Sequence, residues 1–373
     1  MRWKNEAAWW AGWVVALLVG GCSDNVKTRQ TLPPGERMDI FDQVTVGKVD
    51  ILWVIDNSGS TADKQANLAR NFHAFFDYLT QAKVDYHLAV TTTDVQTDAP
   101  CGTPPNTAPC SKGQLYAAPG EPTVITPATP DPVAAFQKNV AVGTSGSGNE
   151  EGLEGARLAL LLKPAGFLRS DAYLYLIFVS DDDDHSDPGE PKYFYRFFAS
   201  EKGKGNEGMV SAGAIVGDVP KGCYEPNGGE ARAGTRYVQV VDLMGGQVGS
   251  VCSTEFADAL EQMGIDAVGL RRKFQLAKTP DVSSIQVTVK YPCGTAKVDP
   301  GCENKSSDCS GGATGGITCG IPELANAPDP QAQNAADGWL YEPSSNSVVF
   351  YGKSIPPKGS EIDVLYWEQG KKP

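Results

Sequence analysis

The chain has 373 residues, of which 41% are hydrophobic and 21% charged, so it can bury one or two ordinary cores and is not a miniprotein that depends on disulfides for its fold. Asp and Glu number 45 against 32 Lys and Arg, which gives a formal net charge of −13. A surface of that sign repels phosphate backbones, so we expect no nucleic-acid partner.

The N-terminus has the pattern of an export signal. Two basic residues precede an apolar run from Ala7 to Gly21 that is too short to span a bilayer comfortably. The run ends in VGGC, which resembles a bacterial lipobox, so we predict a lipoprotein signal peptide over residues 1–21 and lipidation of Cys22. Ser23 favours sorting to the outer membrane, with periplasmic or surface exposure left open. An ordinary signal peptide, or a membrane anchor that happens to end in cysteine, is the alternative.

The other cysteines are expected to form disulfides. They are Cys101, Cys110, Cys223, Cys252, Cys293, Cys302, Cys309 and Cys319. Their even number and the oxidising compartment of an exported protein favour four disulfides. Cys101–Cys110 is the safest pair, because the Pro-rich loop between these residues carries no other thiol. Zinc at the four cysteines from Cys293 to Cys319 is the competing interpretation, but their spacing lacks the close pairs typical of zinc sites. The other pairings stay open.

Residues 22–47 are polar and contain PPG, so they are predicted to be a tether. Residues 48–264 then alternate apolar strands with helical patterns. Strands are expected at 48–56, 84–92, 173–180 and 209–216, and helices at 62–82, 131–140, 150–162 and 192–201. This alternation predicts right-handed crossovers and a doubly wound, mostly parallel, Rossmann-like α/β sheet.

The hydrophobic period changes to two over residues 265–373. Segments 284–290, 347–351 and 362–367 alternate apolar and polar residues. This pattern predicts a small C-terminal antiparallel β-sandwich. A Cys-rich and Gly-rich insertion over 293–337 interrupts it.

The sequence DNSGS, from Asp56 to Ser60, directly follows the first apolar strand. At the carboxyl end of a strand, Gly59 permits a tight turn, and Asp56, Ser58 and Ser60 are expected to point to one place. A carboxylate and two hydroxyls form an all-oxygen site suited to a hard cation such as Mg²⁺. The alternative is that Asp56 caps the following helix and the serines are ordinary helix-start residues.

These residues match the metal-ion-dependent adhesion site of the von Willebrand factor A (VWA) domain, and residues 48–264 resemble that family. The resemblance implies an Asp after a later strand, matched by Asp181, and a Thr from a loop, best matched by Thr144 with Ser145 or Ser147 as alternatives. It also implies bound Mg²⁺, Mn²⁺ or Ca²⁺ with an open position for a carboxylate of a partner protein. The whole chain resembles the VWA lipoproteins of deltaproteobacteria and myxobacteria.

An acidic run, DDDDHSD, begins at Asp181. We expect its residues beyond Asp181 to form a solvated loop, because like charges are destabilising when buried together. A second, Ca²⁺-type site that uses Asp183, Asp184 or Asp187 is the alternative.

The function that these features favour is cation-dependent protein binding by a lipid-anchored protein of the bacterial cell envelope, in adhesion or envelope assembly. We expect no enzymatic activity, because the sequence carries no nucleophile elbow, no P-loop and no visible pair of nucleophile and base. Two alternatives remain: a structural envelope protein whose metal only stabilises the fold, and, less favoured, a metal-dependent hydrolase.

Overall fold

The computed structural model describes residues 32–96, 112–204, 206–226, 229–292, 318–325 and 337–372. The predicted signal peptide over 1–21, the lipidation site Cys22 and the predicted pair Cys101–Cys110 lie outside these residues. None of the helices in the described ranges has the length and apolar character needed to cross a membrane.

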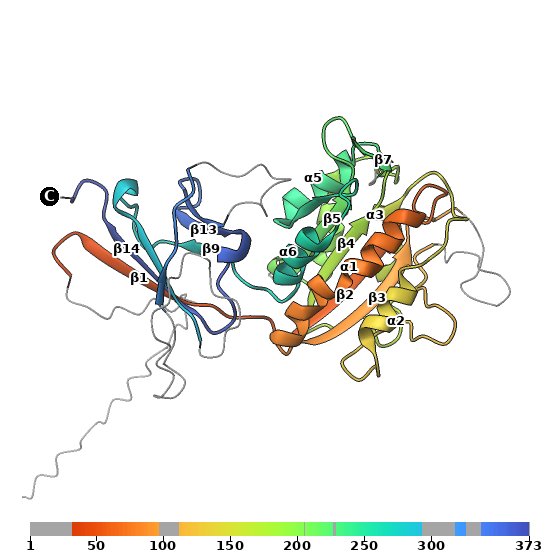
Figure 1. Ribbon diagram of the computed structural model, residues 1–373, viewed down its shortest axis with the longest axis horizontal. Coiled ribbons are helices and arrows are strands. Elements are labelled where there is room, and N and C mark those ends of the chain that lie inside the picture. The colour runs from red at the N-terminus through yellow and green to blue at the C-terminus, as the bar shows by residue number, and fades with distance from the viewer. Residues whose placement is uncertain are drawn as a thin grey trace, which may run out of the picture.

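The described chain forms two lobes (Figure 1). We call residues 48–267 the α/β lobe, and the strands before and after it the β lobe. Two connections run between the lobes and contact each other, since the amide of Val46 donates to the carbonyl oxygen of Val268 at 3.0 Å. The side chain of Gln43 also donates to the carbonyl oxygen of Arg271 at 2.8 Å.

The α/β lobe contains a five-stranded sheet in which every neighbouring pair is parallel, in the order β3-β2-β4-β5-β8. The strands are β2 (Lys48–Ile55), β3 (Asp85–Thr92), β4 (Tyr173–Val179), β5 (Val210–Val216) and β8 (Val248–Ser250). Strand β2 is buried along nearly its whole length. Burial on both faces explains why its sequence from Ile51 to Ile55 is continuously apolar instead of alternating, and the buried Asp50 is paired with Arg169. The prediction of a mostly parallel α/β sheet is confirmed.

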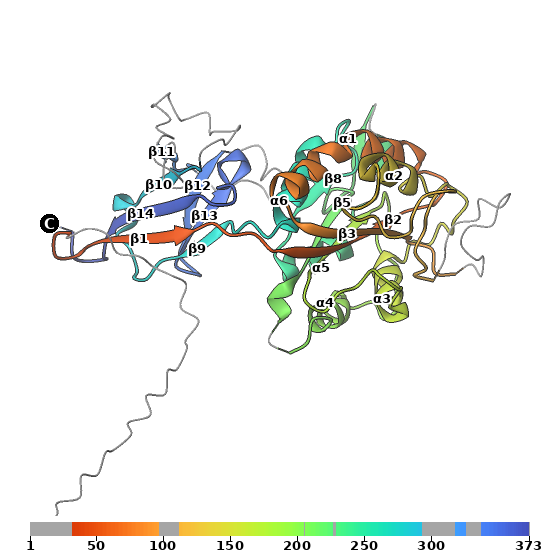
Figure 2. The same cartoon turned by 90° about the horizontal axis from the view of Figure 1, so that it is seen from below.

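Helices cover both faces of this sheet (Figure 2). One face carries α1 (Ala62–Gln81), α2 (Pro132–Asn139) and α6 (Ala257–Ala267), and the other carries α3 (Gly152–Leu162), α4 (Pro191–Ser200) and α5 (Thr235–Met244). On the first face, the ring of Trp53 lies 5.2 Å from that of Phe75 and 5.1 Å from that of Phe136. On the second, Phe178 packs against Tyr237 at 5.3 Å. These two aromatic cores fix β2 and β4 side by side.

The strand order reverses between β2 and β4, because the chain passes from β2 to β3 on one side and then returns to β4 on the other. Loops that leave such a pair of strands diverge, and ligands of doubly wound sheets bind between them, beyond the carboxyl ends of the strands. The amino ends face the β lobe, where the starts of β2 and β5 line a cleft of about 980 Å³ together with Arg271 and Phe350. The carboxyl ends therefore point away from the β lobe.

The β lobe has two antiparallel sheets. The first sheet has the order β1-β14-β10-β11, with β1 (Glu36–Asp42), β14 (Glu361–Trp367), β10 (Gln286–Lys290) and β11 (Thr318–Gly320). The second sheet has the order β12-β13-β9, with β12 (Gly338–Glu342), β13 (Ser347–Tyr351) and β9 (Lys273–Gln275). The ring of Phe41 on β1 lies 5.4 Å from that of Phe274 on β9, so side chains of the two sheets share a core. Short 3-10 turns occur at Glu207–Met209, Val282–Ser284 and Gly352–Ser354.

The tether prediction for residues 22–47 is wrong over Glu36–Asp42, which forms β1. This strand pairs with β14 along its whole length, from Glu36 opposite Trp367 to Asp42 opposite Glu361. The sequence of this strand does not alternate cleanly between apolar and polar residues, because one buried position is the polar Asp39. Its carboxylate accepts the hydroxyl of Tyr366 at 2.9 Å. The β lobe is therefore built from both ends of the chain.

Two further boundaries differ from the prediction. Helix α6 continues to Ala267, beyond the expected domain limit at 264. The expected insertion over 293–337 contains β11, which pairs with β10 and is part of the sheet. The β lobe thus includes a strand from the Gly-rich and Cys-rich segment that we expected to interrupt it.

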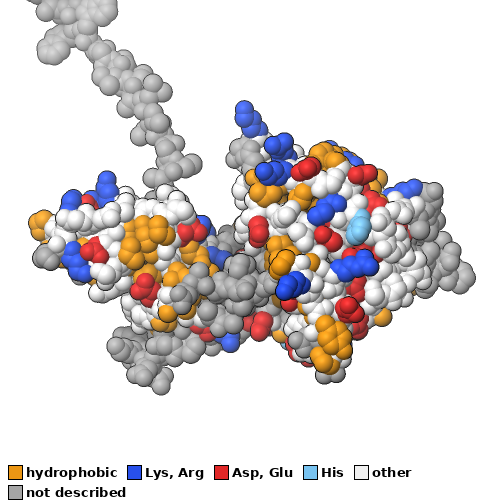
Figure 3. Space-filling view, turned by 90° about the horizontal axis from the view of Figure 1, so that it is seen from above, with side chains coloured by type: hydrophobic (Ala, Val, Ile, Leu, Met, Phe, Trp, Pro, Cys, Tyr) orange, Lys and Arg blue, Asp and Glu red, His pale blue; other side chains and the backbone are white. Residues whose placement is uncertain are grey.

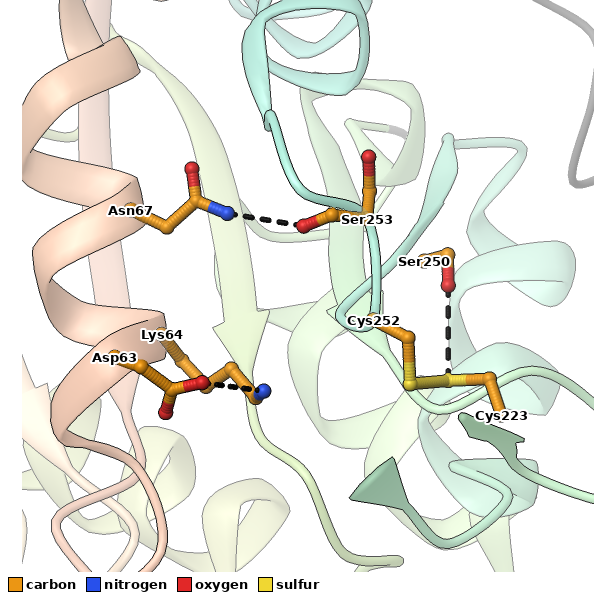
Figure 4. Close-up of a disulfide and its surroundings, with 7 residues drawn as sticks. All are labelled: Asp63, Lys64, Asn67, Cys223, Ser250, Cys252 and Ser253. Carbon is orange, nitrogen blue, oxygen red and sulfur yellow. Dashed lines mark hydrogen bonds and ion pairs between the residues drawn. A yellow bond between two sulfur atoms is a disulfide. The ribbon is translucent and has the colours of Figure 1, made fainter. Parts of the chain in front are cut away.

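A short hairpin of β6 (Cys223–Glu225) and β7 (Gly229–Ala231) is joined to the segment after β8 by a disulfide between Cys223 and Cys252. Figure 4 shows this disulfide facing the first turns of α1, where Asn67 donates to the carbonyl oxygen of Ser253 at 3.0 Å. Cys319 is disulfide-bonded as well. Both observations agree with the expectation of disulfides and argue against Cys319 as a zinc ligand.

Candidate cation site

Asp56 is the first residue after β2, and it is only 1% exposed. Its amide donates to the carbonyl oxygen of Val179 at 2.9 Å, so the ends of β2 and β4 are held together where the strand order reverses. One carboxylate oxygen accepts the amide of Ser58 at 2.8 Å, and the other accepts the hydroxyl of Ser180 at 2.7 Å. Asp56 therefore shapes the turn that positions the two serines.

Helix α1 does not use Asp56 as its cap. The N-cap residue is Thr61, whose hydroxyl donates to the carbonyl oxygens of Asp56 and Ser58 at 3.0 Å each. The alternative in which Asp56 only caps the helix is therefore wrong, and its carboxylate remains in the turn between β2 and α1.

A chain of oxygen contacts joins the remaining residues of the motif to Asp181. The hydroxyls of Ser58 and Ser60 lie 3.3 Å apart, and Ser60 donates to the carboxylate of Asp181 at 3.1 Å. Asp181 follows the end of β4 and is 7% exposed, whereas Ser60 is exposed. Four of the five predicted ligands, Asp56, Ser58, Ser60 and Asp181, thus meet at the carboxyl edge of the sheet.

The loop that contains Thr144 lies against the motif, but Thr144 itself does not reach it. Gln65 donates to the carbonyl oxygen of Gly143 at 2.8 Å, and the amide of Gly146 donates to the carbonyl oxygen of Asn57 at 2.8 Å. The side chain of Thr144 between these anchors is exposed. Across the described ranges, no hydrogen bond joins Thr144 to the four residues above.

The same holds for the two alternatives to Thr144. Ser145 is exposed. The amide of Ser147 donates to the carboxylate of Asp94, which follows β3, at 3.3 Å, and its hydroxyl accepts the amide of Asn149 at 3.0 Å. Across the described ranges, no hydrogen bond joins any of the three hydroxyls proposed from the resemblance to Asp56.

Glu150, which the sequence did not single out, is the residue of this loop that reaches Asp56. It is 1% exposed and accepts the hydroxyl of Thr93, and its carboxyl lies within hydrogen-bonding reach of that of Asp56. Burial, and then the charge of Asp56, raise the pKa of Glu150 to about 9. In the sequence, Glu150 and Glu151 look like the acidic start of an ordinary helix.

The site is a buried set of acidic groups. Burial, and secondly the charge of Asp56, raise the pKa of Asp181 to about 6. In the part of the chain that the structure describes, no ion pair joins a Lys, Arg or His to Asp56, Asp181 or Glu150, and the charge of Lys64 only partly offsets the rise in the pKa of Asp181. Buried carboxylates are stable only when a counter-charge or protons neutralise them, so a divalent cation fits this environment.

The donor set also limits how a cation is held. Among the described residues, no three His, Cys, Asp or Glu side chains surround a common point as metal ligands. A cation here would therefore depend on the hydroxyl oxygens of Ser58 and Ser60 as well as on carboxylates. Oxygen donors of this kind suit Mg²⁺, Mn²⁺ or Ca²⁺.

The acidic run is not a solvated loop throughout, because some of its carboxylates are buried and bonded within the protein. Asp184 is 3% exposed, accepts the amide of Leu153 at 2.9 Å and pairs with Arg236 at 3.2 Å. Asp183 accepts the amide of Arg236 at 2.9 Å, and Asp187 is exposed. Two of these acids thus bind the first turns of α3 and α5, where carboxylates are favoured by the helix dipole.

Comparison with known proteins identifies no family. No family model matches the chain, and no curated protein matches it. Among solved structures, proximal thread matrix protein 1 from the mussel byssus is similar over 62% of this chain and 47% of its own, at 16% identity and a TM-score of 0.33. The pilus adhesin SpaC from Lactobacillus rhamnosus GG is similar over 91% of this chain and 42% of its own, at 12% identity and a TM-score of 0.37. The chain spans about half the length of the mussel protein and 42% of the length of the pilus adhesin.

Proposed function

We propose that this chain is a lipid-anchored protein of the bacterial cell envelope that binds a protein partner through a VWA-type, cation-dependent adhesion site. The residues that would hold Mg²⁺, Mn²⁺ or Ca²⁺ are Asp56, Ser58, Ser60 and Asp181, with Thr144 as the residue implied by the family resemblance. A bound divalent cation supplies an electrophilic point for a carboxylate of the partner.

The observation that carries this proposal is the contact between Ser60 and Asp181, which are 121 positions apart in the sequence. It joins the D-x-S-x-S motif after β2 to the acidic residue after β4, at the point where the strand order reverses. An ordinary helix start does not require an Asp at the end of the neighbouring strand. Ligand binding at this point of a doubly wound sheet explains why both are present.

The surroundings of the site favour a protein partner. Ser60 and Thr144 are exposed, so the site opens to solvent. On the hairpin beside it, Tyr224 is 70% exposed and the side chain of Arg232 is 77% exposed. Tyr and Arg are enriched among the residues that dominate protein interfaces. Acidic and basic side chains are interspersed over the face seen in Figure 3, and a mixed surface of this kind is compatible with a protein ligand.

The two-lobe arrangement suits the proposed anchor at Cys22. Strand β1 begins at Glu36 in the β lobe, and the candidate site lies at the opposite end of the α/β lobe (Figure 1). A chain attached to the outer membrane through Cys22 would therefore hold the β lobe near the membrane and present the site away from it. This orientation supports binding of a partner outside the membrane surface.

A capture experiment on envelope extracts tests the proposal. Wild-type protein should retain a partner in Mg²⁺ and release it in EDTA, and Asp56→Ala should retain none in either buffer. Asp171→Ala, on an exposed residue paired with Lys48 at the opposite end of the sheet, is the matched control. Equal retention by wild type and Asp56→Ala would contradict the proposal.

A structural role for the cation is the second candidate, and Glu150 favours it. A third carboxylate beside Asp56 would neutralise a divalent cation more fully and leave it less able to attract an acidic partner. In that case cation removal should lower the stability of the protein without changing what it captures. Catalysis is not proposed: of the described histidines, His73 and His87 lie on α1 and β3, and the ring of His185 contacts the carbonyl oxygen of Asp183.

A further inference from the structure

We propose that Glu150, and not Thr144, is the cation ligand that the loop before α3 contributes. This inference rests on the proposed cation site. It goes beyond that site because it replaces a neutral hydroxyl by a carboxylate, which changes the charge and the affinity of the site. The argument depends on where the two side chains lie in the structure and on which of their atoms are left without partners.

The carboxyl group of Glu150 is buried, and only one of its two oxygens accepts a hydrogen bond. The residue is 1% exposed, and its Oε2 atom accepts the hydroxyl of Thr93. Its Oε1 atom is buried, and no donor in the described ranges reaches it. Asp56, whose charge raises the pKa of Glu150, presents a second carboxyl group here, and a carboxylate is likewise an acceptor. Two buried acceptors that face each other need a cation or a proton between them.

Thr144 is held away from this position by the backbone on either side of it. Gln65 donates both to the carbonyl oxygen of Gly143 and to that of Asp56, at 2.8 and 2.9 Å. On the other side, the loop at Gly146 packs so closely that an added Cβ atom would lie 2.4 Å from the side chain of Asn57. These contacts fix the loop with the Thr144 side chain exposed.

Hydrogen bonds to the loop after β4 hold Glu150 and the start of α3 in place. Its carbonyl oxygen accepts the amide of His185 at 2.6 Å, and Asp184 beside it accepts the amide of Leu153 at 2.9 Å. The loop after β4 and the start of α3 are therefore bonded to each other next to Asp181. This framework explains how a residue of the loop before α3 is placed between Thr93 and Asp56.

The consequence is a site with more negative charge than the family pattern implies. Asp56 and Asp181 alone would balance one divalent cation, and Glu150 would add a third negative charge beside them. Because these three carboxylates do not surround one point, at least one of them would act on the cation by its charge and not by direct contact. A carboxylate ligand attracts a divalent cation more strongly than a hydroxyl does, above all where water is excluded. We therefore expect tight cation binding that depends on Glu150 and is insensitive to Thr144.

Calorimetric titration of the mature, full-length protein with Mn²⁺ tests this inference. Glu150→Gln should weaken Mn²⁺ binding by roughly tenfold or more, whereas Thr144→Ala should bind like wild type. Asp56→Asn serves as the reference for loss of the whole site. Urea unfolding in EDTA checks the fold of each variant, and Glu150→Gln should unfold no more easily than wild type because Gln has nearly the shape of the Glu150 side chain and adds no charge to the buried site.

The outcomes separate this inference from the proposed function. If Glu150→Gln binds Mn²⁺ like wild type and Thr144→Ala or Asp56→Asn does not, the assignment of Glu150 is wrong and the proposed site stands. If none of the variants changes Mn²⁺ binding, both the assignment and the proposed site are wrong. Weakened binding in Glu150→Gln alone among the loop variants, with an intact fold, supports the inference.

Discussion

Replacing Asp181 by Asn should stabilise the cation-free protein at alkaline pH. The carboxylate of Asp181 is 7% exposed and lies near Asp56, and these two causes, burial first, raise its pKa from 3.8 to about 6. A pKa that is higher in the folded chain than in the unfolded chain means that the folded chain holds the proton more tightly. The stability from this group is complete below about pH 4 and is lost as the pH rises through about 6.

The magnitude follows from the pKa change. Each pKa unit corresponds to about 1.4 kcal/mol, so the ionised carboxylate of Asp181 costs the fold about 3 kcal/mol at pH 8. Asn has nearly the same shape and still accepts the hydroxyl of Ser60, but it carries no charge. We therefore expect Asp181→Asn to raise the free energy of unfolding by about 1 to 3 kcal/mol at pH 8 and to change it little at pH 4.

Urea unfolding in EDTA at pH 4, 6 and 8 measures this effect. The control is Asp171→Asn, at an exposed residue whose pairing with Lys48 is screened by solvent and contributes little to stability. Saturating Mg²⁺ should reverse the order of stability at pH 8, because only the wild type keeps its full set of ligands. Asp181→Asn could instead be no more stable than wild type at pH 8 and show the same dependence on pH. That result would mean that the charge of Asp181 does not destabilise the cation-free fold, and the electrostatic account would fail.

Other parts of the structure give three further predictions. Gly155→Ala should destabilise the protein by about 1 to 3 kcal/mol, because the added Cβ atom would lie 2.6 Å from a backbone carbonyl oxygen of β3. Gly148→Ala is the control, since an added Cβ atom there has open space. If urea unfolding shows the two variants to be equally stable, the packing argument is refuted. Replacing Cys223 and Cys252 by Ser removes a disulfide that joins residues 29 positions apart, and it should lower the free energy of unfolding by about 3 to 4 kcal/mol. The comparison is with the wild type without reductant, and unchanged stability would show that the disulfide does not stabilise the fold. Cys22→Ser should abolish partition of the protein into detergent phase, because acylation needs the thiol, and undiminished partition would exclude the lipid anchor.

The sequence was sufficient to predict the parts of the site that depend on local pattern. Asp56 and Asp181 each follow a continuous apolar strand, and such strands in an alternating α/β pattern are parallel and end at one edge. Ser58 and Ser60 follow from the same turn. Four of the five residues could thus be placed together without knowledge of the sheet order.

Features that depend on distant contacts were not predictable. Glu150 meets Asp56 only because α3 starts beside the end of β2, and nothing in the sequence distinguishes it from Glu151. The partner of β1 is β14, at the other end of the chain, and the buried Asp39 breaks the alternation that would have indicated a strand. In each case the missing information is a contact between segments far apart in sequence.

The central claim is that Asp56, Ser58, Ser60 and Asp181 hold one divalent cation. The most direct test is the shift in unfolding free energy that Mg²⁺ or Mn²⁺ produces in wild type and in Asp56→Ala. At a cation concentration of about 100 times the dissociation constant, the wild type should gain about 2.7 kcal/mol, and Asp56→Ala should gain nothing. An equal gain in both proteins would show that the cation binds elsewhere and would contradict the account.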